Sequence, residues 1–253
     1  LVNRFIIFLK FIREIKNWYL IFLIYFGFLN GNFTLRLKNK LCIKIRATST
    51  DIQALANVFI LEEYGRTGFE IKNNDVVIDV GGHIGLFSLY ASQYCKIGTI
   101  FCFEPIKDNF DLLVSNIQIN NLSNIHYFNK AIFNENKPTR IYLNSSDQAA
   151  HSIFGHGNNF VDIDTTTLSE VMDSNRIKMC NLLKLDCEGS EYEILQSTPD
   201  DYFNRIQKIC LEYHILENNF EPLNLLKSRL TSLGYKVFDM PQKDNLGMLF
   251  AKK

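Results

Sequence analysis

The chain has 253 residues, of which 47% are hydrophobic and 21% charged, and this length suits one large domain or one domain with an appendage. The composition excludes a disordered chain, a collagen and a low-complexity linker. The 27 basic and 27 acidic residues cancel, which disfavours a nucleic-acid binder. They are unevenly spread, because residues 1–50 hold nine Lys and Arg against one acid, whereas residues 51–253 hold 18 against 26.

The first segment, Leu1–Leu29, is apolar but interrupted by charges, and its longest clean apolar run, Trp18–Leu29, is shorter than the roughly 20 residues that span a membrane. Its apolar residues recur at helical spacing, namely Phe8, Phe11, Ile12, Ile15, Trp18 and Tyr19. This pattern predicts an amphipathic helix. Two interpretations remain open. The apolar face packs on the body of the protein, or residues 4–29 contact an anionic membrane surface peripherally.

A β-hairpin is predicted next, because Phe33–Ile45 alternates apolar and polar residues around a turn at Lys38–Lys40. Residues 1–50 are therefore expected to form a helix-and-hairpin appendage, and residues 51–253 the main domain.

From Asp75 onward, apolar strand-like runs alternate with helical spacing, which predicts a doubly wound, mostly parallel α/β sheet. A terminal antiparallel hairpin is expected from Tyr235–Met240 and Gly247–Ala251. The expected parallel strands are Val76–Val80, Thr99–Phe103, Ile125–Ile132, Asn181–Leu185 and Ile209–Tyr213, and the expected helices include Ile84–Cys95 and Asp108–Asn121.

The stretch Phe133–Cys180 breaks this rhythm. It holds two alternating pieces, Arg140–Leu143 and Val161–Asp164, around a polar loop at residues 144–159 that contains His151, Ser152 and His156. A loop of this length is either a lid over a site or a surface insertion.

A cofactor turn is predicted where the first parallel strand runs into a helix through Asp79, Gly81, Gly82, His83 and Gly85. Glycines there let a ligand approach the backbone. The next strand ends in Glu104-Pro105, and an acid at that position can accept hydrogen bonds from ribose hydroxyls. The acid before the glycines would repel a pyrophosphate and attract an ammonium or sulfonium, which favours S-adenosylmethionine over NAD.

The segments Val77–Pro105 and Asn109–Asn121 resemble the FkbM family of S-adenosylmethionine-dependent methyltransferases. Leu183–Leu195 (LKLDCEGSEYEIL) and Leu211–His214 (LEYH) are similar to two further hallmarks of that family. The resemblance covers roughly residues 50–214. One departure is Gly82-His83, where the family more often has Ala-Asn.

The resemblance implies a class I methyltransferase (Rossmann-like) fold and methyl transfer to an oxygen, commonly of a sugar or a natural product. It implies that Asp79, Gly81 and Gly85 surround the methionine part of the cofactor, together with Gly82 and His83 of the same turn. Glu104 and Pro105 would lie at the ribose, Asn129 and Ala131 near the adenine, and Asp186 near the reactive methyl group.

Acidic and imidazole groups recur at a spacing of two at the ends of the last two parallel strands, as Asp186 and Glu188 and as Glu212 and His214. If the strands stay extended, each pair points to one side, toward the acceptor. His214 or a Glu with a raised pKa could then act as general base. Alternatively, the four residues could hold Mg²⁺ or Mn²⁺. A purely structural role, charging the next helix or orienting loops, is the third interpretation.

The sequence therefore predicts an S-adenosylmethionine-dependent O-methyltransferase acting on a glycan or a small hydroxylated metabolite. Six cysteines without a C-x-x-C pair suit a reducing compartment, so we expect a cytoplasmic protein, free or peripheral at the inner membrane face. The alternatives are an inactive methyltransferase fold that binds a partner and an NAD-dependent oxidoreductase, the latter disfavoured by the missing G-x-G-x-x-G. The acidic body ranks a nucleic-acid substrate low.

Overall fold

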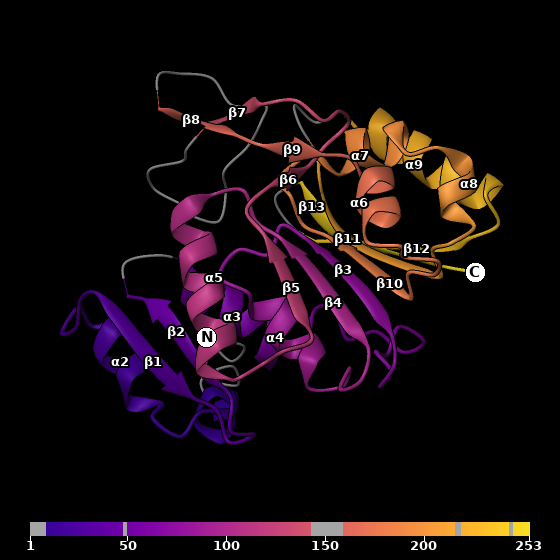
Figure 1. Ribbon diagram of the computed structural model, residues 1–253. Helices are drawn as coiled ribbons and strands as arrows, with labels where there is room; N and C mark the ends of the chain where they lie inside the picture. Colours follow the sequence, from indigo (N-terminus) through magenta and orange to yellow (C-terminus); the bar gives the residue numbers. More distant parts are fainter. Residues whose placement is uncertain (1–8, 48–49, 143–158, 216–218, 243–244) are drawn as a thin grey trace.

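The computed structural model of the protein describes residues 9–47, 50–142, 159–215, 219–242 and 245–253, which surround a seven-stranded sheet (Figure 1). The strands follow the order β12-β13-β11-β10-β3-β4-β5. Five of them are parallel, namely β3 (Val76–Val80), β4 (Thr99–Phe103), β5 (Ile125–Phe128), β10 (Leu182–Leu185) and β11 (Lys208–His214). The antiparallel hairpin predicted at the C-terminus is confirmed as β12 (Lys236–Pro241) and β13 (Leu246–Lys252).

Helices cover both faces of this sheet, as the alternating pattern predicted (Figure 1). Neighbouring strand residues point into different cores, so that Val77 packs with α4 and α5 while Ile78 packs with the helices of the other face. Both side chains are fully buried. The helices are α4 (Leu86–Ser92) and α5 (Lys107–Ile119) on one face, and α6 (Leu168–Ser174), α7 (Glu191–Ser197), α8 (Asp200–Phe203) and α9 (Glu221–Ser232) on the other.

The strand predicted over Ile125–Ile132 is wrong in its second half. The chain leaves the main sheet after β5, and the short β6 (Ala131–Ile132) pairs in parallel with β9 (Thr165–Thr166). At this point the side-chain amide of Asn129 donates to the backbone carbonyls of Glu104 and Pro105, at 2.9 Å in each case, which ties the departing chain to the end of β4.

The irregular stretch Phe133–Cys180 contains more structure than its sequence suggests. Its two alternating pieces form the antiparallel pair β7 (Thr139–Tyr142) and β8 (Phe160–Ile163). Helix α6, which the sequence analysis missed, begins at a capping box of Thr167 and Glu170. All but the last residue of the loop at 144–159, including His151, Ser152 and His156, lies outside the described residues. The lid therefore stays a prediction.

The N-terminal hairpin is confirmed as β1 (Asn32–Arg36) and β2 (Cys42–Arg46), but the single helix predicted before it is wrong. The backbone is helical over residues 9–14, forms a β-bridge from Ile15 to Leu37, and becomes helical again in α2 (Tyr19–Tyr25). At this point the backbone pairs with the edge of β1 and does not continue the helix. The N–H of Lys16 donates to the carbonyl of Arg36 at 2.7 Å.

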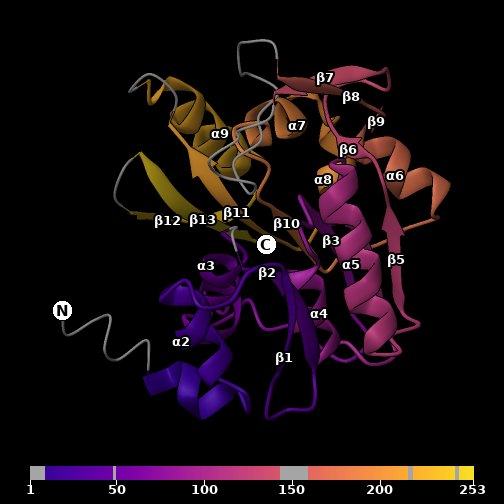
Figure 2. The same cartoon turned by 90° about the vertical axis from the view of Figure 1, so that its left-hand side faces the viewer.

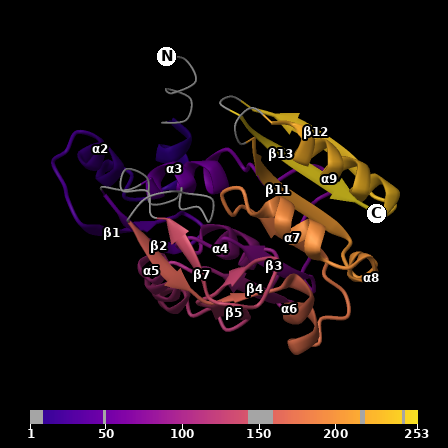
Figure 3. The same cartoon turned by 90° about the horizontal axis from the view of Figure 1, so that it is seen from above.

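The N-terminal hairpin shares its hydrophobic core with the main domain, on the face of α4 and α5 (Figures 2 and 3). Asn116 of α5 accepts from the N–H of Lys44 at 2.6 Å, and Asn120 accepts from the N–H of Cys42 at 2.8 Å. Between the hairpin and β3 lie α3 (Asp51–Leu55) and the π-helix η1 (Ala56–Ile60). Among the described residues, no helix is both long enough and apolar enough to cross a membrane.

Candidate active site

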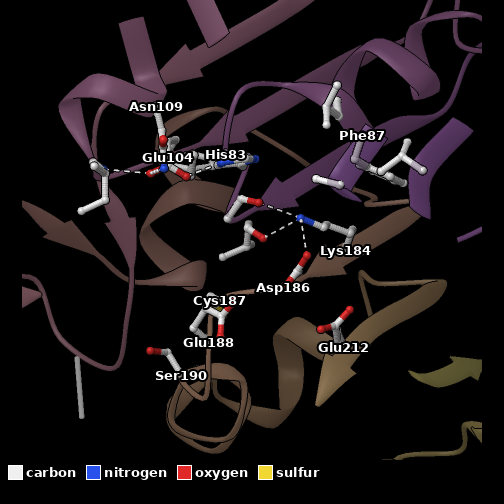
Figure 4. A pocket seen from close by; sticks show the side chains of 18 of the residues that line it. His83, Phe87, Glu104, Asn109, Lys184, Asp186, Cys187, Glu188, Ser190 and Glu212 are labelled. Carbon is white, nitrogen blue, oxygen red and sulfur yellow. Dashed lines mark hydrogen bonds and ion pairs between the residues drawn. The ribbon is translucent and has the colours of Figure 1, made fainter. Parts of the chain in front are cut away.

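A pocket of about 340 Å³ opens at the carboxyl ends of β3, β4, β10 and β11, where ligands of open α/β sheets bind (Figure 4). Glu104 and His83 lie at one end of the pocket, and Asp186, Glu188 and Glu212 lie at the other. Helix α3, its N-cap residue and η1 contribute lining residues that the sequence analysis missed, namely Thr50, Gln53, Ala54, Asn57 and Val58.

The predicted glycine turn is confirmed as a tight turn. Gly81 has φ +76°, and a Cβ there would lie 1.8 Å from the carbonyl oxygen of Asp186. The N–H groups of Gly81 and Gly82 donate to the carbonyl of Phe103 at 3.1 and 2.9 Å. Gly81, Gly82 and His83 line the pocket, whereas Gly85 stands outside the lining as the left-handed N-cap of α4. The turn thus brings bare backbone against the cavity.

The structure corrects the position expected for Asp79, which is fully buried and stands behind the pocket lining. Its Oδ2 accepts from the hydroxyl of Ser88 at 2.7 Å, and its Oδ1 lies 3.1 Å from Nζ of Lys184. This carboxylate therefore acts on the glycine turn through Lys184, which also donates to the carbonyl of Gly81 at 2.7 Å.

Lys184 is the main site residue that the sequence analysis missed. It projects from the central strand β10, is 2% exposed, and lies 3.9 Å from Asp186 as well as near Asp79. Burial opposes its charge, but the Asp79 and Asp186 carboxylates more than offset burial, so its pKa is raised above the ordinary value. A lysine inside an otherwise apolar parallel strand was the available signal, because such a charge needs a buried partner.

Glu104 lies where the sequence predicted a ribose acceptor. Its two carboxylate oxygens accept the backbone N–H groups of His83 at 2.8 Å and of Ile106 at 2.9 Å. Burial raises the pKa of Glu104 to about 7 against the lowering effect of these bonds. A carboxylate has further lone pairs, so Glu104 can accept hydroxyl hydrogen bonds as well. The contact with ribose stays a prediction.

Near the expected adenine site, the structure brings together only part of the predicted set. Pro105 and Ala131 line the pocket beside Glu104. Asn129 lies outside this lining, because its amide is directed at the two carbonyls that hold the turn after β4. Its role is thus to shape the turn.

His83 of the glycine turn is linked to the N-terminal hairpin. Burial lowers the pKa of His83 to about 4, so the ring is neutral and its Nε2 can accept from Nη2 of Arg46 at 3.2 Å. Arg46 is held in place by Asp51, whose carboxylate it meets at 2.8 and 3.0 Å. The hairpin therefore reaches the cofactor turn directly, a link between distant segments that no local pattern indicates.

At the acceptor end, Asp186 is oriented by two groups. The hydroxyl of Tyr64 donates to its Oδ2 at 2.9 Å, and Lys184 approaches the same oxygen. The extended geometry assumed for the Asp186–Glu188 pair is wrong, because β10 ends at Leu185 and Glu188 adopts φ +53°. Both side chains nevertheless line the pocket.

The geometry argues against His214 as general base. Its Nε2 lies 3.2 Å from Glu188 and its Nδ1 lies 3.6 Å from Glu191. Burial alone would lower its pKa, but these two carboxylates raise it to about 11. An imidazolium has no lone pair with which to take a proton.

Glu212 fits the alternative prediction, that a Glu with a raised pKa acts as general base. It lines the pocket from β11, two residues before His214, where the strand is still extended. Burial raises its pKa to about 8, with help from the charges of Asp186 and Glu63. Such a carboxyl changes protonation near neutral pH, as a general base must.

For metal binding, no group of three or more His, Cys, Asp or Glu side chains with suitable geometry occurs within the described part of the chain. Mg²⁺ or Mn²⁺ at Asp186, Glu188, Glu212 and His214 stays a prediction. The pocket does fit a sulfonium cofactor, because it combines the bare turn at Gly81, the acceptor Glu104 and an excess of carboxylates in its lining.

Comparison with known proteins identifies the family, since residues 79–237 match the Methyltransferase FkbM domain. "Methyltransferase 1" of Beauveria bassiana is 25% identical over 65% of this chain and 74% of its own length. The 31-O-demethyl-FK506 methyltransferase FkbM of Streptomyces tacrolimicus is 28% identical over 72% of this chain and 81% of its own. The hexuronic acid methyltransferase AglP of Haloferax volcanii is 28% identical over 50% and 51%.

The solved structure of methyltransferase FkbM from Methylobacillus flagellatus has the same fold, with a TM-score of 0.51 and 13% identity over 79% of this chain and 48% of that one. The strand order and the antiparallel last pair are those of a class I methyltransferase, as the resemblance implied. The chain belongs to the FkbM family of S-adenosylmethionine-dependent methyltransferases.

Proposed function

We propose that this methyltransferase transfers the methyl group to a hydroxyl oxygen of a sugar or a small hydroxylated metabolite, with Glu212 as general base. The observation that carries the proposal is the Glu212 carboxyl, with a pKa raised to about 8, in the pocket that also holds Asp186 and the glycine turn. A hydroxyl must lose its proton as it takes the methyl group, and a positioned carboxylate can accept that proton.

Two relatives support an oxygen acceptor. One is named for methylating a demethylated hydroxyl position of FK506, and the other for methylating a hexuronic acid. The first name specifies an oxygen as the methylated position, and the second specifies a sugar acid as the acceptor.

S-adenosylmethionine supplies an electrophilic methyl group. The residues of this chain then position the cofactor and the acceptor, since much of the rate of such a transfer comes from alignment of the two substrates. Asp186, fixed by Tyr64 and Lys184, is placed to accept a hydrogen bond from the acceptor. The imidazolium of His214, fixed by Glu188, adds a positive charge 3.7 Å from Glu212 that helps its carboxylate form.

The test is the variant Glu212→Gln, assayed for production of S-adenosylhomocysteine over a panel of glycosides and polyols. We expect the variant to bind S-adenosylhomocysteine as the wild type does and to lose roughly 10²–10⁴-fold in kcat. The exposed Glu221→Gln is the matched control. An unchanged kcat in Glu212→Gln would contradict the assignment of the base. A product whose methyl group is released by mild alkali would be an ester and would contradict a hydroxyl acceptor.

A further inference from the structure

Helix α2 and the turn that follows it lie on the outer side of the N-terminal unit (Figure 2), and their exposed aromatic side chains form a patch. One face of α2 packs against the hydrophobic core that the hairpin shares with α4 and α5, where Ile21 and Ile24 are each 8% exposed. Its other face is turned to solvent. The exposed fractions on that face are 53% for Tyr19, 44% for Phe22, 76% for Tyr25, 54% for Phe26 and 71% for Phe28.

The patch is held in shape by its own contacts. The ring centroids of Phe22 and Phe26 lie 4.5 Å apart, and those of Tyr25 and Phe26 lie 5.4 Å apart. The N–H of Phe28 donates to the carbonyl of Leu23 at 2.8 Å, which closes the end of the helix. The aromatic side chains are therefore presented outward by an ordered backbone, at a cost in hydration that monomeric proteins usually avoid.

Basic residues dominate the described N-terminal segment that carries this patch. Lys16 precedes α2 and pairs through its backbone with Arg36 of β1 at 2.7 Å, and both side chains are exposed. The described residues 9–47 contain eight basic residues and one acidic residue, Glu14. Glu14 forms an ion pair with Arg13. The eight are Lys10, Arg13, Lys16, Arg36, Lys38, Lys40, Lys44 and Arg46, of which Arg46 is paired with Asp51 beside the cofactor turn.

We propose that this aromatic patch seats the protein on the interface of an anionic lipid bilayer. Tyrosine and phenylalanine rings favour the boundary between headgroups and acyl chains, and basic residues beside them are attracted to anionic headgroups. The attachment is peripheral, with the side chains of α2 entering the interface while Ile21 and Ile24 keep the helix on the core. This surface is separate from the methyl-transfer pocket and does not depend on the proposed acceptor.

Charge complementarity selects a lipid surface over a second copy of the chain. An interface between two identical patches would bring two N-terminal segments of the same positive charge together, and such like-charge contact is unfavourable. An anionic bilayer is apolar below its surface and carries the opposite charge, which matches the exposed aromatic side chains and the net positive charge of the N-terminal segment.

The experiment is co-sedimentation of the full chain with vesicles of phosphatidylcholine alone or mixed with phosphatidylserine. The single tryptophan, Trp18, directly precedes α2, so its fluorescence provides a second readout. We expect binding to the anionic vesicles with a blue-shifted Trp18 emission, and weaker binding as salt rises from about 0.1 M to about 0.5 M. Tyr25→Ser with Phe28→Ser should weaken binding by roughly tenfold or more.

The matched control is Ile97→Ser with Leu225→Ser, which removes exposed apolar side chains, 76% and 55% exposed, from other elements and should leave vesicle binding unchanged. Equal circular dichroism spectra establish that all variants are folded. No binding at low salt, or equal binding by the Tyr25→Ser, Phe28→Ser variant, would overturn the proposal. So would a wild-type dimer in sedimentation that this variant abolishes, since the patch would then join two copies.

Discussion

The ammonium of Lys184 lies 3.1 Å from Oδ1 of Asp79, and both side chains are almost completely buried between β3 and β10. The pair sits directly under the glycine turn, because Lys184 also donates to the carbonyl of Gly81. Two motifs separated by more than a hundred residues, the cofactor turn and the LKLD segment, thus form one electrostatic unit.

Breaking this ion pair on one side should be costly. Lys184→Met leaves the Asp79 carboxylate buried without its cation, and we expect the free energy of unfolding to fall by about 3–5 kcal/mol. Urea denaturation measures the change. The double variant Asp79→Asn, Lys184→Met should recover most of the loss, and the exposed Lys107→Met should shift stability by less than about 0.5 kcal/mol. Equal effects of the single and double variants would contradict the pairing.

The pH dependence of catalysis should report Glu212. With its pKa raised to about 8, the base is protonated in acid and becomes competent as the pH rises. We therefore expect kcat/KM to increase through about pH 8 in the wild type and to lose this rise in Glu212→Gln. A profile with an inflection near pH 6.5, the ordinary pKa of histidine, would instead implicate an unperturbed imidazole.

Stability without ligands should fall over a defined pH range. The folded-state pKa values of Glu104, about 7, and Glu212, about 8, both lie above the ordinary glutamate value of 4.5, so folding favours the protonated forms. Their contribution is complete below about pH 4.5 and is lost as the pH rises toward 7 and 8. Thermal melts of the double variant Glu104→Gln, Glu212→Gln should show a flatter profile over this range than the wild type.

Arg46 should control cofactor affinity from outside the pocket. Arg46→Met removes the donor to Nε2 of His83, whose backbone N–H holds Glu104. We expect the Kd for S-adenosylhomocysteine to rise roughly tenfold, the size of one lost hydrogen bond, while the acceptor KM at saturating cofactor is unchanged. Arg36→Met on the same hairpin is the control. Isothermal titration with S-adenosylhomocysteine measures the Kd of each variant. Equal Kd values in Arg46→Met and Arg36→Met would contradict the link from Arg46 to the cofactor turn.

The acceptor end should discriminate against anionic substrates. Glu63, Asp186, Glu188 and Glu212 converge there, while the cations Lys184 and His214 are already paired with carboxylates. A neutral glycoside should therefore show a higher kcat/KM than the matching uronate, by about tenfold at low salt, so that this chain would differ in preference from the Haloferax volcanii relative named for a hexuronic acid. Competition assays with the two sugars measure the ratio, and a preference for the uronate would contradict this charge argument.

The sheet was predictable because its parallel strands are buried on both faces. A short apolar run bounded by turn residues, such as Val76–Val80, is typical of a parallel strand that is buried on both faces. Glu104 was predictable for a similar reason, since the tip of the second strand always lies beside the first turn in this topology. Local pattern and global fold agree at these positions.

Other features depend on contacts between distant segments. The helix break at Ile15 exists because β1 offers an edge for pairing. The burial of Asp79 follows from β10 lying next to β3, which brings Lys184 within reach. The imidazolium of His214 is produced by two carboxylates from the loop and helix after β10. In each case the deciding partner comes from elsewhere in the chain, so spacing along the sequence carries no signal for it.

The bonds of Asn116 and Asn120 to β2, and of Arg46 to His83, set the lower size limit of a working enzyme. A shortened chain beginning at residue 51 would retain the whole seven-stranded sheet and almost all of the pocket lining. It would nevertheless uncover the apolar side of α5 and release the cofactor turn. We therefore expect an active enzyme to need the hairpin, although the hairpin lies outside residues 79–237, which match the family.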